Sequence, residues 1–303
     1  MSGQGPKAQA VAWIDGRWGT PAELAVPLQD RGLLLADGLF ETVLVQAGRP
    51  VLLEAHLQRW CASAALLAMD PPPGAAQLEP LIREAIERAG LRPGSGRCGA
   101  LRLNWSRGSG EGRGIDLQAE SGAGREHGHR FWLQLSPFTP SFSPQTAQIS
   151  RYERRNGASR LSRCKTFAYG QAIQARREAR AAGADEALLL STQGYLCCGA
   201  VANLLVRAKG HWLTPPLNSG CLPGVMRARA LELSLAKEAE LIWDGARLQI
   251  DAGTIRYDAP EPAPLGPWLL LNSLGCRPLS RVDDQPLPLL SPADAEEFWQ
   301  QLL

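Results

Sequence analysis

Only four of the 32 lysine and arginine residues are lysines, and Lys165 is the strongest candidate for chemistry among them. Arginine keeps its proton at cellular pH, whereas a partly desolvated lysine can lose it and become a nucleophilic amine. An amphipathic run after Lys165 predicts a helix over 167–182, and an apolar strand is expected at 186–191. Because most lysines are solvated and unreactive, a chemical role for Lys165 has to be supported by the residues around it.

Three other groups of residues could bind a small anionic molecule. Arg59 falls in a predicted helix, 54–69, and its planar guanidinium suits the paired oxygens of a phosphate or carboxylate. Arg107 falls in a glycine-rich stretch, 106–114. Gly224 opens a predicted helix that runs to about residue 237, and the backbone amides at a helix start can bind phosphate. Taken alone, each is equally compatible with a surface arginine or a plain turn.

The chain order places these residues in two domains. A hairpin over 11–18, helices over 54–69 and 77–89 and strands over 100–105 and 130–136 predict a smaller N-terminal domain, 1–136. Three prolines between 137 and 144 predict an interdomain linker, 137–145, because proline suits neither a helix interior nor a central strand. The remainder, 146–303, is expected to form a larger C-terminal domain that carries Lys165.

Composition excludes several classes of protein. A net charge of +2 with interspersed signs gives no basic stripe, which argues against nucleic acid as a partner. We also expect no membrane segment, because no stretch approaches about 18 apolar residues, and a cytoplasmic location, because no secretory leader is evident. Seven cysteines, an odd number, favour reduced thiols over a disulfide framework, and no His or Cys spacing predicts a metal site.

Several motifs together resemble the fold-type IV pyridoxal-phosphate enzymes, a family that includes D-amino-acid and branched-chain aminotransferases and aminodeoxychorismate lyase. The motifs occur in the family's order along nearly the whole chain. They are a D-R-G…D-G-x-F-E segment (30–41), H-x-x-R (56–59), S-R-G-S-G (106–110), K-T (165–166), D-E-A-L-L-L (185–190), G…N-L-L (194–205), G-x-x-x-G-V-x-R (220–227) and N-S (272–273).

The resemblance implies a fold, a cofactor and a set of site residues. The fold is a two-domain α+β architecture with a pseudobarrel sheet in the larger domain and pyridoxal 5'-phosphate between the domains. A homodimer acting on a small-molecule substrate is also implied. Lys165 would be the catalytic lysine that forms a Schiff base with the cofactor. The other cofactor-binding residues would be Arg59, Cys198, Asn203, Gly224, Val225, Met226 and Ser273, and the substrate-binding residues Phe40, Glu41 and Arg107.

Cys198 departs from the family pattern, since most relatives have a glutamate there that keeps the cofactor's pyridine nitrogen protonated. We expect a neutral thiol, with a pKa at or above the ordinary value of about 8.5, to be a weak partner for that nitrogen. Transamination should then be poor in the native protein, and Cys198→Glu should raise it.

The S-R-G-S-G stretch is closest to the lyases, so the sequence predicts an aminodeoxychorismate lyase that forms p-aminobenzoate and pyruvate from 4-amino-4-deoxychorismate on the folate route. The alternative is a class IV aminotransferase acting on D-amino or branched-chain amino acids, supported by the Phe40-Glu41 pair. A non-catalytic pyridoxal-phosphate binder is a third possibility, but the presence of both Lys165 and Arg59 argues against complete loss of the site.

Overall fold

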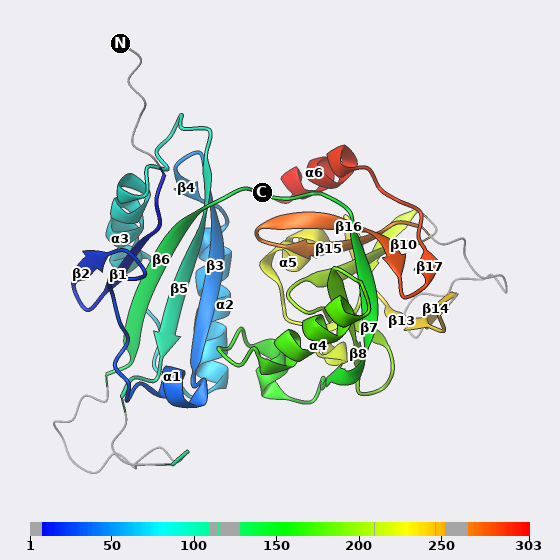
Figure 1. Ribbon diagram of the computed structural model, residues 1–303, viewed down its shortest axis with the longest axis horizontal. Helices are drawn as coiled ribbons and strands as arrows, with labels where there is room; N and C mark the ends of the chain where they lie inside the picture. The colour runs from blue at the N-terminus through cyan, green and yellow to red at the C-terminus, as the bar shows by residue number, and fades with distance from the viewer. Residues whose placement is uncertain (1–7, 110–113, 116–127, 209, 246, 252–265) are drawn as a thin grey trace. The chain divides into compact units, whose positions relative to one another are not determined.

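The computed structural model describes residues 8–109, 114–115, 128–208, 210–245, 247–251 and 266–303 (Figure 1). The chain divides into two units. Unit 1 comprises Met1–Thr139 together with Lys165–Ala168, and unit 2 comprises Pro140–Cys164 together with Tyr169–Leu303. Among the described residues, no helix is long and apolar enough to cross a membrane.

Unit 1 is an antiparallel sheet with helices packed against it (Figure 1). The helix α2 packs on β3, and α3 packs on β1 and β6. Sheet neighbours follow the order β2-β1-β6-β5-β3-β4. The bounds are β1 (Val11–Ile14), β2 (Arg17–Gly19), α1 (Arg31–Leu35), β3 (Gly38–Gln46), β4 (Arg49–Pro50), α2 (Leu53–Leu66), α3 (Ala75–Arg88), β5 (Cys98–Ser106) and β6 (Arg130–Phe138).

Strand alternation gives the two faces of this sheet different roles. Leu103 and Leu133 lie opposite Glu41 in the sheet register and share its face, which is covered by α2. Phe40, one residue earlier on β3, therefore points to the other face. Arg102 lies opposite Thr42 and shares the face of Phe40.

Unit 2 contains a closed ring of strands, the pseudobarrel that the sequence predicted. The path β10-β15-β16-β7-β8-β9 returns to β10 because Asn203 pairs with Cys198. β11 and β12 extend the sheet beyond β10, β17 pairs with β16, and β13 and β14 form a separate pair. The bounds are β7 (Gln145–Arg155), α4 (Gly170–Ala181), β8 (Glu186–Ser191), β9 (Leu196–Gly199), β10 (Asn203–Ala208), β11 (His211–Thr214), α5 (Val225–Glu232), β12 (Ala236–Glu238), β13 (Glu240–Trp243), β14 (Leu248–Asp251), β15 (Trp268–Asn272), β16 (Gly275–Val282), β17 (Gln285–Pro286) and α6 (Pro292–Gln300), with short 3-10 turns at Arg160–Arg163 and Leu217–Ser219.

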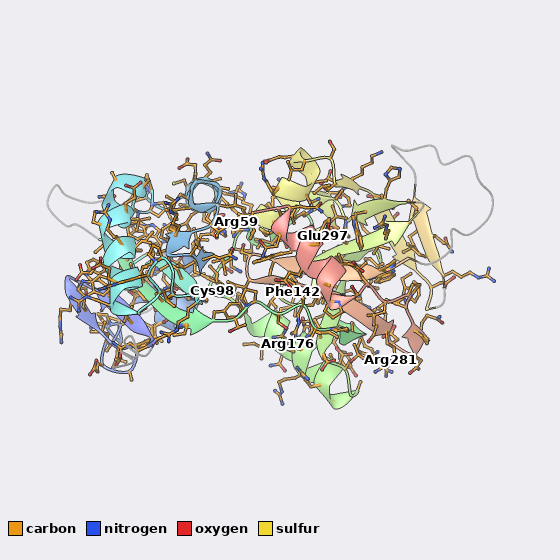
Figure 2. The ribbon with its side chains drawn as sticks, turned by 90° about the horizontal axis from the view of Figure 1, so that it is seen from above. Arg59, Cys98, Phe142, Arg176, Arg281 and Glu297 are labelled. Carbon is orange, nitrogen blue, oxygen red and sulfur yellow. The ribbon has the colours of Figure 1, made fainter. Side chains whose placement is uncertain are left out.

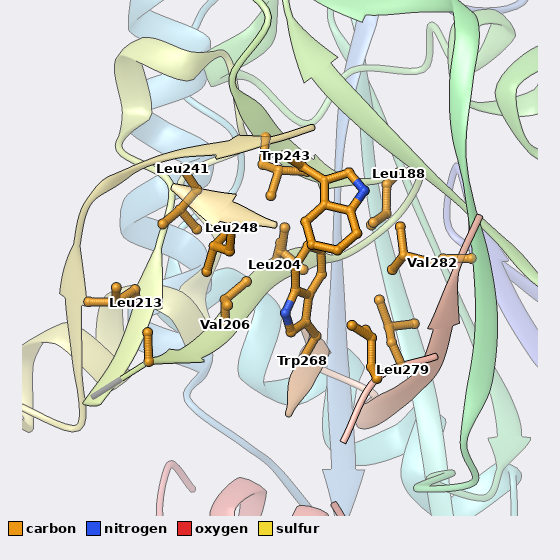
Figure 3. Close-up of a cluster of buried hydrophobic side chains, with 14 of the residues drawn as sticks. Leu188, Leu204, Val206, Leu213, Leu241, Trp243, Leu248, Trp268, Leu279 and Val282 are labelled. Carbon is orange, nitrogen blue, oxygen red and sulfur yellow. The ribbon is translucent and has the colours of Figure 1, made fainter. Parts of the chain in front are cut away.

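The two faces of the ring bury different side chains. One face holds a large apolar cluster in which Trp243 packs edge-on against Trp268, with centroids 5.2 Å apart (Figure 3). The other face is lined by small residues, including Ala175 and Ala179 of α4 with Cys197 and Cys198 of β9. Small side chains on both surfaces let α4 lie close to the strands.

Three elements differ from the sequence predictions. The helix after Gly224 ends at Glu232 rather than near 237, because Ser234 adopts a left-handed φ of 57° and the chain continues as β12. The G…N-L-L motif over 194–205 does not lie on one strand but on two, β9 and β10, which pair with each other. Lys165 was assigned to the second domain, whereas Lys165–Ala168 belongs to unit 1, in which the Phe40 amide donates to the Lys165 carbonyl.

Candidate active site

Lys165 is held against β3 of unit 1 by two backbone hydrogen bonds that flank the next residue, Thr166. The Phe40 amide donates to the Lys165 carbonyl at 2.9 Å, and the Phe167 amide donates to the Gly38 carbonyl at 3.0 Å. The Lys165 Nζ lies 4.4 Å from the centroid of the Phe40 ring, in a cation–π contact. The lysine therefore extends along a fixed aromatic surface.

Gly38 makes this attachment possible. A β-carbon at Gly38 would lie 2.2 Å from Cε2 of Phe167, a separation that two carbon atoms cannot adopt. Phe167 also packs against Phe40 and Trp132, with centroid distances of 6.3 and 5.5 Å. The glycine of the D-G-x-F-E motif thus lets the ring of Phe167, two residues from Lys165, pack directly on β3.

The opposite face of β3 carries a buried ion pair. Glu41 accepts hydrogen bonds from Nε of Arg59 at 2.8 Å and from Nη2 of the same guanidinium, and it lies 2.7 Å from Nδ1 of His56. Both partners come from α2, and Arg59 is labelled in Figure 2. The Glu41 and His56 side chains are each 1% exposed. The carboxylate therefore sets the orientation of Arg59.

The charges in this cluster are defined by their mutual contacts. Burial favours the protonated form of Glu41, but the Arg59 charge and the hydrogen bonds from His56 and Arg59 outweigh it and lower the Glu41 pKa to about 2. Burial lowers the pKa of His56, and the positive charges of Arg59 and Lys165 lower it further. Glu41 and Arg59 are thus an ion pair at neutral pH, and the neutral His56 ring donates to it.

Arg107 lies among structural partners. Its Nε donates to Asp37 Oδ2 at 3.1 Å, and its two terminal nitrogens donate to the carbonyls of Leu67 and Ala68 at 2.9 and 2.8 Å. The side chain is 13% exposed. Arg107 therefore joins the C-terminal end of α2 to the segment before β3 through its Nε and both terminal nitrogens.

Arg102 is a candidate that the sequence analysis missed. Its guanidinium carbon lies 3.6 Å from the centroid of the Phe40 ring, and its Nε donates to Asn104 at 2.7 Å. Arg102 and Lys165 are thus two cations on the ring of one phenylalanine. The alternation of β5 could have indicated it, because the polar residues Arg102 and Asn104 alternate with Leu101 and Leu103.

Unit 2 contains a loop shaped for an anion at the start of α5. Asn203 on β10 donates to the Leu222 carbonyl at 2.9 Å and so holds this loop. Gly224, the N-cap, lies so close to Asn203 that an added β-carbon would be 2.0 Å from its Oδ1. The amides of Val225 and Met226, in the first turn of α5, have no acceptor within the helix.

Ser273 belongs to the neighbourhood of this loop. It follows β15, the strand on which α5 packs and which pairs with β10 from Asn203 onward. The four residues that the sequence assigned to phosphate binding in the second domain, Gly224, Val225, Met226 and Ser273, are therefore brought together with Asn203 in one part of unit 2.

Cys198 differs from its predicted state. The sequence analysis expected a neutral thiol whose pKa is at or above the ordinary value. A hydrogen bond from Cys197 lowers the pKa of Cys198 instead; burial opposes this, but the Arg155 charge and hydrogen bond add to the lowering. The expected direction of the Cys198 pKa is therefore wrong, because nothing in the sequence placed Arg155 beside Cys198.

Comparisons with known proteins agree on the family. The amino-transferase class IV family matches residues 38–244. Aminodeoxychorismate lyase of Bacillus subtilis (strain 168) is 25% identical over 274 residues, which cover 90% of this chain and 87% of that protein. The bifunctional aminodeoxychorismate lyase / D-amino acid transaminase of Mycobacterium tuberculosis is 28% identical over 254 residues, with 75% and 78% covered.

A fold IV-transaminase from Curtobacterium pusillum matches in structure with a TM-score of 0.75 at 25% identity, over 96% of this chain and 99% of that one. Other relatives are named branched-chain-amino-acid and D-alanine aminotransferases. The α+β fold-type IV architecture predicted from the sequence is confirmed.

Proposed function

Because the chain belongs to the class IV aminotransferase family, whose cofactor is pyridoxal 5'-phosphate, we propose that it is an aminodeoxychorismate lyase. It would convert 4-amino-4-deoxychorismate to p-aminobenzoate and pyruvate. The observation that carries this proposal is the Ser106-Arg107-Gly108 segment, which resembles that of the lyases. Ser106 donates to the fully buried Asp30 at 2.8 Å, so the segment is built into the fold.

The residues of unit 2 fit the phosphate end of the cofactor. Gly224 leaves open the space beside Asn203 that a β-carbon would fill, and the amides of Val225 and Met226 point out of a helix start with its partial positive charge. When bound, pyridoxal phosphate withdraws electrons from the carbon that carries the substrate's amino group. We assign Lys165 as the residue to which it is attached, and Gly224, Val225, Met226 and Ser273 as phosphate ligands.

Lys165 supplies the proton transfers in this proposal. As a free amine it removes the proton from the carbon that bears the substrate nitrogen. The bond from the ring to the enolpyruvyl oxygen then breaks, the ring becomes aromatic, and the enolpyruvate takes a proton at its methylene carbon to become pyruvate. The cation–π contact keeps the Lys165 Nζ on one side of the Phe40 ring. From there it can reach the substrate carbon that bears the nitrogen in each turnover.

Arg102 is assigned to a substrate carboxylate, since it shares the Phe40 ring with Lys165. We predict that Arg102→Gln raises KM for the aminated substrate by about 10- to 100-fold and changes kcat much less, as expected when a charged hydrogen bond of about 1.5–3 kcal/mol is lost. Steady-state kinetics of Arg102→Gln beside Arg97→Gln, a change on a turn of the same unit, would check this. An unchanged KM would remove Arg102 from the site.

Gly224→Ala is predicted to weaken pyridoxal phosphate binding by about tenfold or more, equivalent to at least about 1.4 kcal/mol. The reason is the 2.0 Å approach to Asn203 Oδ1, which forces the loop away from its position. The matched control is Gly170→Ala at the first position of α4, where an added β-carbon meets no atom within 4 Å. Equal cofactor affinity in the two variants, measured by fluorescence titration, would contradict the assignment.

A homodimer forms part of the proposal. Leu33 and Leu34 of α1 are 58% and 64% exposed, and Leu28 nearby is 81% exposed. Adjacent exposed leucines of this kind are typical of surfaces that associate. Light scattering of the purified protein should give twice the chain mass.

Product analysis tests the function directly. The protein is incubated with chorismate, glutamine and an amidating synthase that forms the aminated substrate, and p-aminobenzoate is quantified. Formation of p-aminobenzoate with an equal amount of pyruvate is expected. The second candidate is a D-amino-acid aminotransferase, favoured by the bifunctional relative, and D-alanine with 2-oxoglutarate measures it. Pyruvate from D-alanine without any p-aminobenzoate would overturn the lyase proposal.

A further inference from the structure

A β-bulge in unit 2 places two neighbouring thiols on the same side of the sheet. In the pairing of β8 with β9, Leu189 lies opposite Cys198 and Leu190 lies opposite Leu196, so Cys197 has no partner of its own. Both cysteines pack in the cluster that includes the α4 alanines, whereas Leu196 packs in the cluster on the other face. Without the bulge, strand alternation would send the two thiols to opposite faces.

The thiols form a chain of contacts that ends in a guanidinium. Ser219 Oγ donates to Cys197 Sγ at 3.4 Å, and Cys197 has two acceptors for its own proton, the Ser219 carbonyl at 3.3 Å and Cys198. Arg155, at the end of β7, donates to Cys198 and is held by Gln171 Oε1, 3.1 Å from its Nη1. Cys197 and Cys198 are 0% and 5% exposed.

The pKa values of Cys198, Arg155 and Cys197 move in the directions expected for an ion pair between Cys198 and Arg155. The Cys197 hydrogen bond and the Arg155 charge lower the pKa of Cys198, against the effect of burial. Burial would lower the pKa of Arg155, but Cys198 raises it. The hydrogen bond to Cys198 and burial raise the pKa of Cys197, so this partner keeps its proton. These directions favour the negative charge on Cys198 and the proton on Cys197.

The other charged and titratable groups around Cys198 do not supply a competing cation or base. Glu186 on β8 opposes the negative charge of Cys198, but this carboxylate is paired with Arg176 of α4. Tyr169 lies near Arg155, before α4. Burial raises the pKa of Cys221 to about 11, so it stays protonated.

We propose that Arg155 is a positioning residue that holds Cys198 as a thiolate, with Cys197 as hydrogen-bond donor, and that this anion faces the protonated ring nitrogen of the cofactor. The second part rests on the proposed cofactor site. A thiolate and a carboxylate carry the same charge, so the substitution of the family's glutamate by Cys198 keeps an anion at this position. The proton that Cys198 loses goes to solvent when the site assembles.

The first test is a pH titration of thiolate ultraviolet absorbance on the cofactor-free protein. In the wild type we expect an absorbance change equivalent to one thiol, with a midpoint at least about one pH unit below the ordinary cysteine pKa of about 8.5. Cys198→Ser should remove this change. Arg155→Gln should raise its midpoint by about 1–3 units, the range for loss of an adjacent opposite charge. Arg155→Lys should keep the midpoint low, because it retains the charge.

Arg154→Gln is the matched control, because Arg154 is the adjacent residue on β7 and donates to the carbonyls of Ser150 and Glu153. It should leave the midpoint unchanged. The proposal would be overturned if no thiol of the wild-type protein titrates with a lowered midpoint, or if that midpoint does not move in Arg155→Gln. The wild-type titration needs no variant to fold, and it needs neither substrate nor turnover.

The second test measures the protonation state of the cofactor's ring nitrogen. Nitrogen-15 resonance of ring-labelled pyridoxal phosphate should report a protonated ring nitrogen in the wild-type protein and a largely neutral one in Cys198→Ser. An unchanged resonance would mean that the thiolate does not face the ring. Failure of the lyase assay with both of these results intact would reject only the proposed substrate, so the two proposals can be distinguished.

Discussion

Lys165→Ala is expected to lower p-aminobenzoate formation by about 10,000-fold or more, the upper range for loss of a positioned acid–base group. The variant loses both the attachment point of the cofactor and the amine that moves the substrate proton. The fold should survive, because the backbone hydrogen bonds of Lys165 and the seating of Phe167 on Gly38 do not involve the lysine side chain.

Lys237→Ala is the control, since Lys237 is an exposed residue on β12 and its replacement removes the same charge. It should retain wild-type turnover. Cofactor binding by Lys165→Ala, followed by fluorescence, separates loss of chemistry from loss of the binding site. Wild-type turnover in Lys165→Ala would reject the role of this lysine.

Glu41→Gln is expected to lower the free energy of unfolding by about 3–5 kcal/mol at neutral pH, because it leaves the Arg59 guanidinium buried without its counter-charge. Denaturant unfolding measures the change. The matched control is Glu54→Gln on the exposed side of α2, where Glu54 only accepts from Gln58, and its effect should stay within about 0.5 kcal/mol. Equal effects of the two substitutions would contradict the ion pair.

The Glu41 contribution also depends on pH. Its pKa falls from an ordinary 4.5 to about 2 in the folded protein, so the native state binds fewer protons than the unfolded state between these values. The stabilisation is therefore complete above about 4.5 and is lost as the pH falls toward about 2. The difference in stability between the wild type and Glu41→Gln should narrow over that interval.

Sequence predicted best where the signal is local. The strand over 186–191 follows from a short apolar run, and the structure has a strand at those residues. The hairpin predicted over 11–18 is also present as β1 and β2, and both residues of its turn, Asp15 and Gly16, have positive φ. The family resemblance supplied the closure of the strands into a pseudobarrel.

Sequence predicted least where a side chain depends on a distant partner or on an irregularity. Glu41 and Arg59 are 18 residues apart, and only the packing of α2 on β3 makes them a pair. The charge state of Cys198 depends on Arg155, which lies on another strand, and on a bulge that no local pattern signals. Both cases are tertiary contacts between polar groups, whose energies depend on burial and geometry that residue types do not show.

The most direct measurement of the central claim, that Lys165 carries the cofactor, is peptide mapping by mass spectrometry after borohydride reduction of the protein reconstituted with pyridoxal phosphate. Reduction makes the link between cofactor and lysine permanent. The account predicts one modified peptide, with the added mass on Lys165, and none on Lys7, Lys209 or Lys237. A stoichiometric adduct on any of those three lysines, or no adduct on Lys165, would contradict it.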